Sequence, residues 1–343
     1  MSSSKSKLPF VSICTPTFNR RPFIPFMIKC FENQTYPKDK MEWIIVDDGF
    51  DPIEDLVKHI PCVKYYKYDT KMTLGKKRNI MNSHASGSII VYMDDDDYYP
   101  PERVMHAVET LKANPKAMCA GTSEMHLYFK HLEQMYQFGP YGPNHSTAAT
   151  FAFRRELLSQ TKYDESSCLA EERVFLKEYT IPFVQLDPLK SILVISHAHN
   201  SFDKRTLLDE PNQFIKVSTK NVCEFIKEPE MVQFYMHDVD KMLEKYEPGS
   251  PIHKQDVNAQ ILVLKEEREQ MMRRHENSAI FKMEMQMREQ MQLQLQHCVN
   301  HYEQLLAEKT RLVTETMKRN KTLMQRIIEL ESNILLKTNI KKD

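Results

Sequence analysis

The stretch Ile89–Pro101 reads IIVYMDDDDYYPP. Its first five residues are apolar, which predicts a buried strand, and four aspartates follow where that strand should end. Adjacent carboxylates repel one another, and a divalent cation is the usual source of compensation. Asp94 and Asp96 can point to the same side of an extended segment, so we expect them to bind Mn²⁺ or Mg²⁺. For an acidic run taken alone, a solvated turn or a helix N-cap before Pro100 is the alternative.

Two similar apolar runs, Val11–Cys14 and Trp43–Val46, precede this predicted strand. Amphipathic helical stretches such as Ile24–Glu32 and Arg103–Lys112 alternate with the apolar runs. Alternating strands and helices predict an α/β fold built on a parallel sheet. Ligands of such sheets bind at the carboxyl ends of the strands, which is where the polar clusters of this sequence stand.

Polar motifs follow the first two predicted strands and open a predicted helix. Pro16–Arg20 is a polar loop after the first strand, and Asp47-Asp48-Gly49 follows the second, where a carboxylate can accept hydrogen bonds from a ribose or a base. Leu74–Asn79 combines three cations with a helix N-terminus, which favours an anion such as a pyrophosphate. An ordinary turn and a solvated helix start are the alternatives for the last two motifs.

Two motifs further along the chain are candidates for chemistry. Glu171 and Glu172 precede an apolar stretch, and a carboxylate near a bound nucleotide can act as a general base. The first turn of an amphipathic helix would give the same acidic pattern. His197 follows the strand-like run Ile192–Ile195, and its imidazole can bind a metal, although a histidine in such a place is more often structural.

The C-terminal part of the chain has a different composition. After the break at Glu247–Pro251, the segment Ile252–Asp343 contains neither glycine nor proline and is rich in helix-forming residues. Its apolar residues recur every seven positions, which predicts a coiled coil. A single helix cannot bury such a seam by itself, so we expect a homo-oligomer. The seam consists of Val299, Leu306, Val313, the polar Asn320, Ile327 and Ile334, paired with Leu295, Tyr302, Leu323 and Leu330, a second series that Lys309 and Thr316 interrupt.

Bulk composition excludes several classes of protein. Basic and acidic residues balance at 47 each, so nothing favours a nucleic-acid-binding protein. The seven cysteines are scattered without a C-x-x-C pair, which argues against a disulfide framework or a zinc site and favours a reducing compartment. The chain lacks the apolar run of a signal peptide or a membrane span, so we expect a cytoplasmic protein.

The ordered set of motifs resembles glycosyltransferase family 2, which has a GT-A fold. The resemblance covers about Leu8–Arg205 and looks closest to small family 2 enzymes of large DNA viruses, which would place the protein in the host cytoplasm. It implies a nucleotide-sugar-binding α/β domain with a mixed, mostly parallel sheet flanked by helices. The motifs that carry it are P-T-F-N-R (16–20), V-D-D-G (46–49), L-G-K-K-R-N (74–79) and Y-M-D-D-D-D-Y-Y-P-P (92–101), extended by Thr147–Arg155, the acidic pair and His197–Asn200.

The resemblance implies roles for individual residues. Asp94, Asp96 and His197 would hold the metal, and a nucleotide sugar, usually a UDP-sugar in similar enzymes, would be the donor. The family's base is usually the Asp of a Glu-Asp pair; here Glu172 matches by position, with Glu171 as the other candidate. The residues expected to contact the donor are Pro16, Phe18, Asn19, Arg20, Asp47, Asp48, Gly75, Arg78, Asn79 and Asp95.

The sequence therefore predicts a metal-dependent, inverting glycosyltransferase with a hydroxyl acceptor on a glycan, a protein or a lipid. We expect the GT-A domain over residues 1–205, a helical linker or lid over 206–250, and a long helix or coiled coil over 251–343. Two other classes stay open. One is a scaffolding protein with an inactive transferase-like domain, and the other is a nucleotidyltransferase, which also uses paired carboxylates and a metal.

Overall fold

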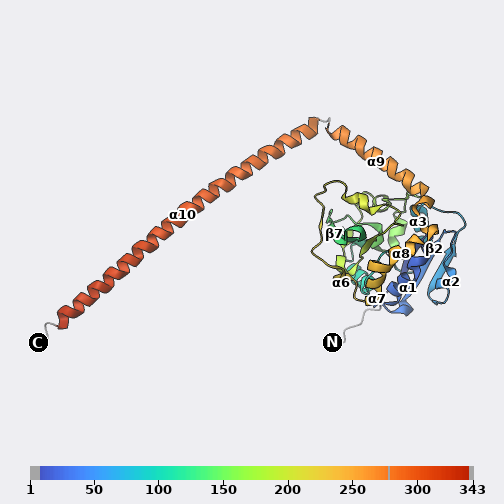
Figure 1. The fold of residues 1–343 in the computed structure, drawn as a ribbon, viewed down its shortest axis with the longest axis horizontal. Helices are drawn as coiled ribbons and strands as arrows, with labels where there is room; N and C mark the ends of the chain where they lie inside the picture. The colour runs from blue at the N-terminus through green and yellow to red at the C-terminus, as the bar shows by residue number, and fades with distance from the viewer. Residues whose placement is uncertain (1–7, 277–278, 340–343) are drawn as a thin grey trace. The chain divides into compact units, whose positions relative to one another are not determined.

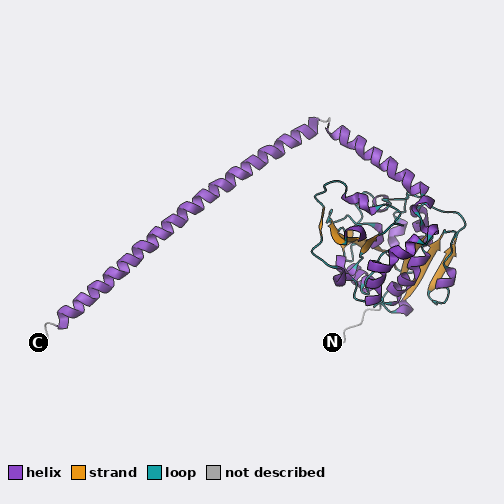
Figure 2. Cartoon of the chain, in the orientation of Figure 1, coloured by secondary structure: helices purple, strands orange, loops and turns teal. Residues whose placement is uncertain are grey.

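The computed structural model describes residues 8–276 and 279–339 (Figures 1 and 2). The chain forms two compact units, one that ends at Leu264 and one that begins at Lys265. The first unit therefore includes the 206–250 segment and the start of the predicted tail. The predicted division at residues 205 and 250 separates a catalytic domain, a linker or lid, and a tail by their expected roles, and it stays a prediction.

The first unit is built on a seven-stranded sheet with the strand order β3-β2-β1-β4-β8-β5-β9. Strand β1 pairs in parallel with β2 and β4, and β2 with β3, whereas β8 runs antiparallel to β4 and β5. The sheet is thus mixed and mostly parallel, as predicted. Its strands are β1 (Val11–Thr17), β2 (Met41–Asp47), β3 (Val63–Lys67), β4 (Ile89–Tyr92), β5 (Cys119–Gly121), β8 (Ala152–Arg154) and β9 (Phe183–Gln185).

A smaller sheet with the order β10-β6-β7-β11 stands beside the large one. A bridge between Tyr98 and Leu193 joins the segment after β4 to the segment before β10. This connection brings His197, just after β10, toward the acidic run. The strands are β6 (Met125–Phe129), β7 (Gln134–Phe138), β10 (Val194–Ser196) and β11 (Ile215–Val217). The sequence predicts a helical segment over residues 206–250, but β11 lies within it, so the segment is only partly helical.

Helices cover both faces of the large sheet, which explains why its central strands are apolar throughout. Val11 and Ile13 of β1 point into one core with α1 and α4, whereas Cys14 points into a second core with α3. The helices of this unit are α1 (Ile24–Glu32), α2 (Glu54–Val57), α3 (Leu74–His84), α4 (Arg103–Ala113), α5 (Glu172–Phe175), α6 (Val222–Phe225), α7 (Pro229–Gln233), α8 (Val239–Glu244) and the start of α9 (Gln255–Glu276).

The second unit consists of the remainder of α9 and one long helix, α10 (Ala279–Asn339). Apolar seam residues of α10 such as Val299, Leu306 and Leu323 are exposed in the single chain. This exposure agrees with a seam that needs a partner, and the coiled coil stays a prediction. The side chain of Ile334 lies outside the described part. No helix among the described residues is long and apolar enough to cross a membrane.

A buried carboxylate ties the amino ends of three strands together. Oε1 of Glu42, on β2, accepts hydrogen bonds from Ser12 Oγ at 2.5 Å and from the Ser86 amide at 2.6 Å. Its Oε2 lies 2.6 Å from Nζ of Lys64. Although burial opposes ionisation, Lys64 and the serines lower the pKa of Glu42 to about 2. The ionised side chain therefore stabilises the sheet.

Replacing this side chain tests that contribution. We expect Glu42→Gln to lower the free energy of unfolding at pH 7 by about 2 kcal/mol, because hydrogen bonds to a charged group are lost. Since the pKa of about 2 in the folded protein lies below the ordinary glutamate pKa of 4.5, the contribution is complete above pH 4.5 and disappears as the pH falls toward 2. Chemical denaturation across this range should show the deficit shrinking. Glu32→Gln, at an exposed site on α1, is the control; a deficit that does not change with pH would contradict the assignment.

Candidate functional site

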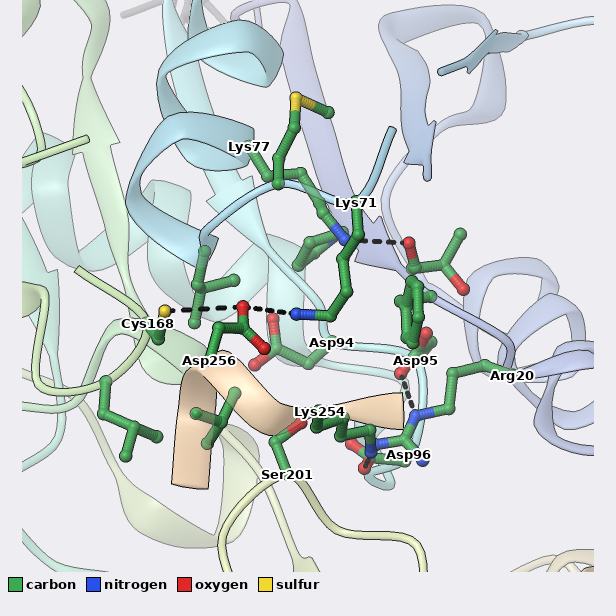
Figure 3. A pocket seen from close by; sticks show the side chains of 17 residues that line it. Arg20, Lys71, Lys77, Asp94, Asp95, Asp96, Cys168, Ser201, Lys254 and Asp256 are labelled. Carbon is green, nitrogen blue, oxygen red and sulfur yellow. Dashed lines mark hydrogen bonds and ion pairs between the residues drawn. The ribbon is translucent and has the colours of Figure 1, made fainter. Parts of the chain in front are cut away.

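A pocket of about 740 Å³, open to solvent, lies at the carboxyl ends of β1 and β4 (Figure 3). Six of the residues expected to bind donor or metal line it: Pro16, Phe18, Arg20, Asp94, Asp95 and Asp96. The other residues expected to bind donor or metal do not line it. The remaining lining residues are Thr17, Lys71, Met72, Leu74, Lys77, Cys168, Leu169, Ser201, Lys254, Asp256 and Val257.

The acidic run is compensated unevenly along its length. Asp96 Oδ2 lies 3.1 Å from a guanidinium nitrogen of Arg20 and 3.1 Å from His197 Nε2. Burial by itself would raise the pKa of Asp96, but these two partners hold it well below its usual range. Asp95 Oδ1 lies 3.5 Å from Arg20 Nε, yet burial raises the pKa of Asp95 to about 7. Asp96 is thus ionised at neutral pH, whereas Asp95 changes its protonation state near pH 7.

Asp97 plays a different part from the other three acids. Its Oδ1 accepts a hydrogen bond from the Ile195 amide at 3.2 Å, and its carbonyl oxygen accepts one from Tyr235 at 3.0 Å. Burial and the Asp96 charge raise its pKa well above the usual value. Asp97 therefore joins β10 to the acidic run. It is not one of the residues that line the pocket.

His197 and Asn200 form a short buried turn against Asp96. The His197 amide donates to Asn200 Oδ1 at 2.8 Å, and the Asn200 amide nitrogen lies 2.8 Å from His197 Nε2. Burial lowers the pKa of His197 to about 3, so its imidazole is neutral at physiological pH. A neutral imidazole is the form that binds metals.

The fit of a divalent cation depends on which oxygens are free. In the described part of the chain, Asp94 Oδ1 and Asp95 Oδ2 are buried without a hydrogen-bond partner. Within the same part, no group of three or more His, Cys, Asp or Glu side chains is arranged to hold a metal. Mg²⁺ usually takes only one or two protein carboxylates and completes its shell with substrate phosphates and water. The donor set therefore fits a cation that binds together with a phosphorylated ligand.

Asp47 and Asp48 organise the loops around the pocket. Asp47 accepts hydrogen bonds from Gly49 N at 2.8 Å and from the Tyr65 hydroxyl at 2.7 Å. Asp48 accepts one from the Met72 amide at 2.6 Å and pairs with Lys77. Their carboxylates are thus engaged with protein groups, and the predicted direct contact with the nucleoside is untested.

Asn19 has a similar place in the loop after β1. Its backbone is left-handed, with φ of 52°, and its side-chain oxygen accepts from the Asp51 amide at 3.2 Å. Its side-chain nitrogen donates to the Pro248 carbonyl at 2.8 Å. Asn19 therefore joins the loop after β1 to the segments around Asp51 and Pro248.

The predicted pyrophosphate motif on α3 divides into two groups of residues. Lys77 lines the pocket, whereas Gly75 and Asn79 pack against the loop before α5. A Cβ at Gly75 would lie 2.0 Å from the Asp164 carbonyl oxygen, and the Asn79 side chain exchanges two hydrogen bonds of 2.9 Å with the Tyr163 backbone. Both residues therefore hold that loop in place.

Arg78 is buried between two predicted functional carboxylates. Its Nε donates to Glu171 at 2.7 Å, and a terminal nitrogen lies 3.5 Å from Asp94 Oδ1. Its guanidinium also stacks 4.6 Å from the centre of the Tyr92 ring. Arg78 thus links the acidic run to the acidic pair instead of lining the pocket.

The two glutamates of the acidic pair have different environments. Glu171 is buried and paired with Arg78. Burial, and then the neighbouring Glu171 charge, raises the pKa of Glu172 to about 7. A carboxylate with a pKa near the working pH is suited to proton transfer. The pair is separated by Ala170 from Cys168 and Leu169, which line the pocket, whereas the two glutamates do not line it.

Sequence reasoning missed several pocket residues. Lys71, Lys254 and Asp256 come from segments without a recognisable motif, and the break at Glu247–Pro251 suggested that the catalytic unit ended there. Lys77 had a signal, because it stands among the three cations at the start of α3. Ser201 reaches the pocket because of the turn after β10, and no motif in the sequence indicated this.

Comparisons with known proteins agree with this geometry. Residues 12–176 match the family model "Glycosyl transferase family 2". The chain is 32% identical over 115 residues to a GalNAc(5)-diNAcBac-PP-undecaprenol beta-1,3-glucosyltransferase of Campylobacter jejuni, covering 31% of this chain and 35% of that protein. It is 28% identical over 109 residues to the poly(ribitol-phosphate) beta-N-acetylglucosaminyltransferase TarS of Staphylococcus aureus, covering 28% of this chain and 18% of that protein.

A solved structure, residues 1–349 of S. aureus TarS in complex with UDP-GlcNAc, is 18% identical with a TM-score of 0.44, covering 54% of this chain and 58% of that one. The chain thus spans about a third or less of the curated relatives named above, and the narrower resemblance to viral enzymes is untested. Over residues 12–176, just under half of its length, this chain is therefore similar to the glycosyl transferase family 2 model.

Proposed function

We propose that the chain is a metal-dependent, inverting glycosyltransferase that moves a sugar from a UDP-sugar to an acceptor hydroxyl. The observation that carries the proposal is the pocket itself. It combines buried carboxylate oxygens that lack hydrogen-bond partners among the described residues, on Asp94 and Asp95, with cations that reach it from separate segments. Such a mixture of charges suits a diphosphate bound together with a divalent cation.

Asp94 and Asp96 would hold Mn²⁺ or Mg²⁺, with His197 as the further ligand. When bound, the ion would supply electrostatic stabilisation of the negative charge that develops on the leaving diphosphate. Arg20 and Lys77 supply fixed positive charge on the same pocket. Because these side chains are already held by Asp96 and Asp48, they need little reorganisation when the donor binds.

Glu172 is the proposed base that removes the proton from the acceptor hydroxyl. Its raised pKa keeps a fraction of the side chain protonated near neutral pH, whereas Glu171 is held by Arg78. The acceptor oxygen would attack the anomeric carbon from the face opposite to the diphosphate. The anomeric configuration is inverted in this single displacement, and the proton passes to Glu172.

The names of the relatives support sugar transfer, since they describe a glucosyltransferase and an N-acetylglucosaminyltransferase. The acceptor can be a glycan, a protein or a lipid, and these classes are arms of the assay. A nucleotidyltransferase would release pyrophosphate in place of UDP. A scaffold with an inactive domain would release neither.

The first test is turnover of a panel of UDP-sugars by the full chain with Mn²⁺. We expect UDP release that chelation abolishes and that Asp96→Asn lowers by at least about 100-fold, because preorganised charge in the site is lost. Asp39→Asn, at an exposed turn, is the matched control. Pyrophosphate release, full activity of the Asp96 variant, or no turnover of any donor would each sink the proposal.

The second test separates the two glutamates. We expect Glu172→Gln to lower transfer by about 10²–10⁴-fold, the usual contribution of a general base, while UDP binding is retained. In the wild type, the rate should rise with pH through about 7, since the base acts only when deprotonated. Glu171→Gln should instead lower the melting temperature, because it leaves Arg78 without its closest partner. Loss of transfer only in a well-folded Glu171 variant would assign the base to Glu171.

We also propose that the tail sets a homo-oligomer through its exposed apolar seam. The expected result is that a chain ending at Leu264 sediments as a smaller species than the full chain and still turns over donor. Sequence analysis alone would place the cut near Pro251, but this would remove Lys254 and Asp256 from the pocket. Leu306→Glu with Leu323→Glu in the full chain should reproduce the smaller species. A monomeric full-length protein would rule out the self-associating tail.

A further inference from the structure

The segment before α9 contacts the loops that follow β1 and β2. The Pro248 carbonyl accepts from Asn19, and the Tyr246 hydroxyl donates to Asp51 at 2.7 Å. The His253 ring packs 5.1 Å from the Phe50 ring. These contacts fix the start of the tail helix against the pocket, far in sequence from the family motifs.

The first turns of α9 then join two loops that line the pocket. Asp256 forms an ion pair with Lys71 (Figure 3). Gln260 Oε1 accepts hydrogen bonds from the amides of Cys168 at 2.6 Å and Leu169 at 3.0 Å. The start of α9 is therefore part of the pocket wall and not only the beginning of a coiled coil.

Lys254 stands at the point where this segment reaches the acidic run. The residue is only 3% exposed, and its side chain lines the pocket. Its Nζ donates to the His199 carbonyl at 2.6 Å, and the same oxygen accepts from Arg20 at 2.6 Å. Among the described residues, Lys254 has no carboxylate within ion-pair distance. An ammonium has three donors, so two remain for a ligand.

A buried cation without a counter-ion is costly. Burial, and then the Arg20 charge, lowers the pKa of Lys254 to about 6. An anion bound in the pocket would reverse both effects, since it would supply acceptors and a compensating charge. The carboxylates of Asp95 and Asp96 act on Lys254 only through space, and their nearest cation is Arg20.

We propose that Lys254, brought to the pocket by the start of the tail helix, binds the diphosphate of the nucleotide-sugar donor. The inference rests on the proposed function, because it places a further ligand in the same donor site. It also makes the segment from Tyr246 to Gln260 a part of the catalytic unit. Family motifs end well before this segment, so no motif assigns the residue.

The test compares three variants of the full chain: Lys254→Met, Lys254→Arg and Lys265→Met. Lys265 is exposed on α9 and serves as the matched control. Calorimetry with Mn²⁺ measures the Kd of UDP, and ligand-observed NMR measures the binding of uridine, which has no phosphate. We expect Lys254→Met to weaken UDP binding by about tenfold or more and to leave uridine binding unchanged, since hydrogen bonds between charged groups are strong. Lys254→Arg should recover most of the UDP affinity.

The other possible results would contradict either the role of Lys254 or the proposed function. If Lys254→Met binds UDP within about twofold of the wild type, or loses uridine and UDP binding together, Lys254 is not a phosphate ligand. If Lys265→Met weakens UDP binding as much as Lys254→Met, the effect is not local to the pocket and the inference fails. If the wild-type protein neither binds UDP nor turns over any UDP-sugar, the proposed function itself fails. Binding and turnover by the wild type with a normal Lys254→Met variant would overturn only the role of Lys254.

Discussion

The structure depends on burying adjacent carboxylates at the end of one strand. Asp94, Asp95 and Asp96 begin one residue after the end of β4 and line a pocket, and each needs charge or hydrogen bonds from elsewhere. Arg20 comes from the loop after β1, Arg78 from α3, and His197 from the turn after β10. Compensation of the acidic run thus draws together segments that are far apart in the chain.

The compensation is incomplete, and this incompleteness is what makes the site chemically useful. Oxygens on Asp94 and Asp95 lack hydrogen-bond partners among the described residues, and the buried Lys254 near the same run has no carboxylate within ion-pair distance there. A ligand that carries both a cation and phosphates would satisfy the aspartates and the lysine at once. Arg78 extends the network to Glu171, so the charge state of the donor side and the position of the proposed base are linked.

Much of the fold could be predicted, because β1, β2 and β4 are apolar runs that end in polar clusters, and sheet topology brings such ends together. The predicted roles of Asp47, Asp48, Arg78 and Asn79 were drawn from motif positions. The structure shows that their side chains have partners in the protein, since buried polar groups must be satisfied, and their contacts with the donor stay predictions. Lys254 could not be predicted, because its place depends on how residues 246–260 dock onto distant loops. The composition break near Pro251 indicated a domain boundary there, but the first compact unit continues to Leu264.

The most direct test is a crystal structure of the protein with UDP and Mn²⁺, using the anomalous signal of manganese to locate the ion. The account predicts an anomalous peak beside the carboxylates of Asp94 and Asp96, with the diphosphate of UDP between that peak and the Lys254 ammonium. A nucleotide bound elsewhere, or no manganese at these aspartates, would contradict it.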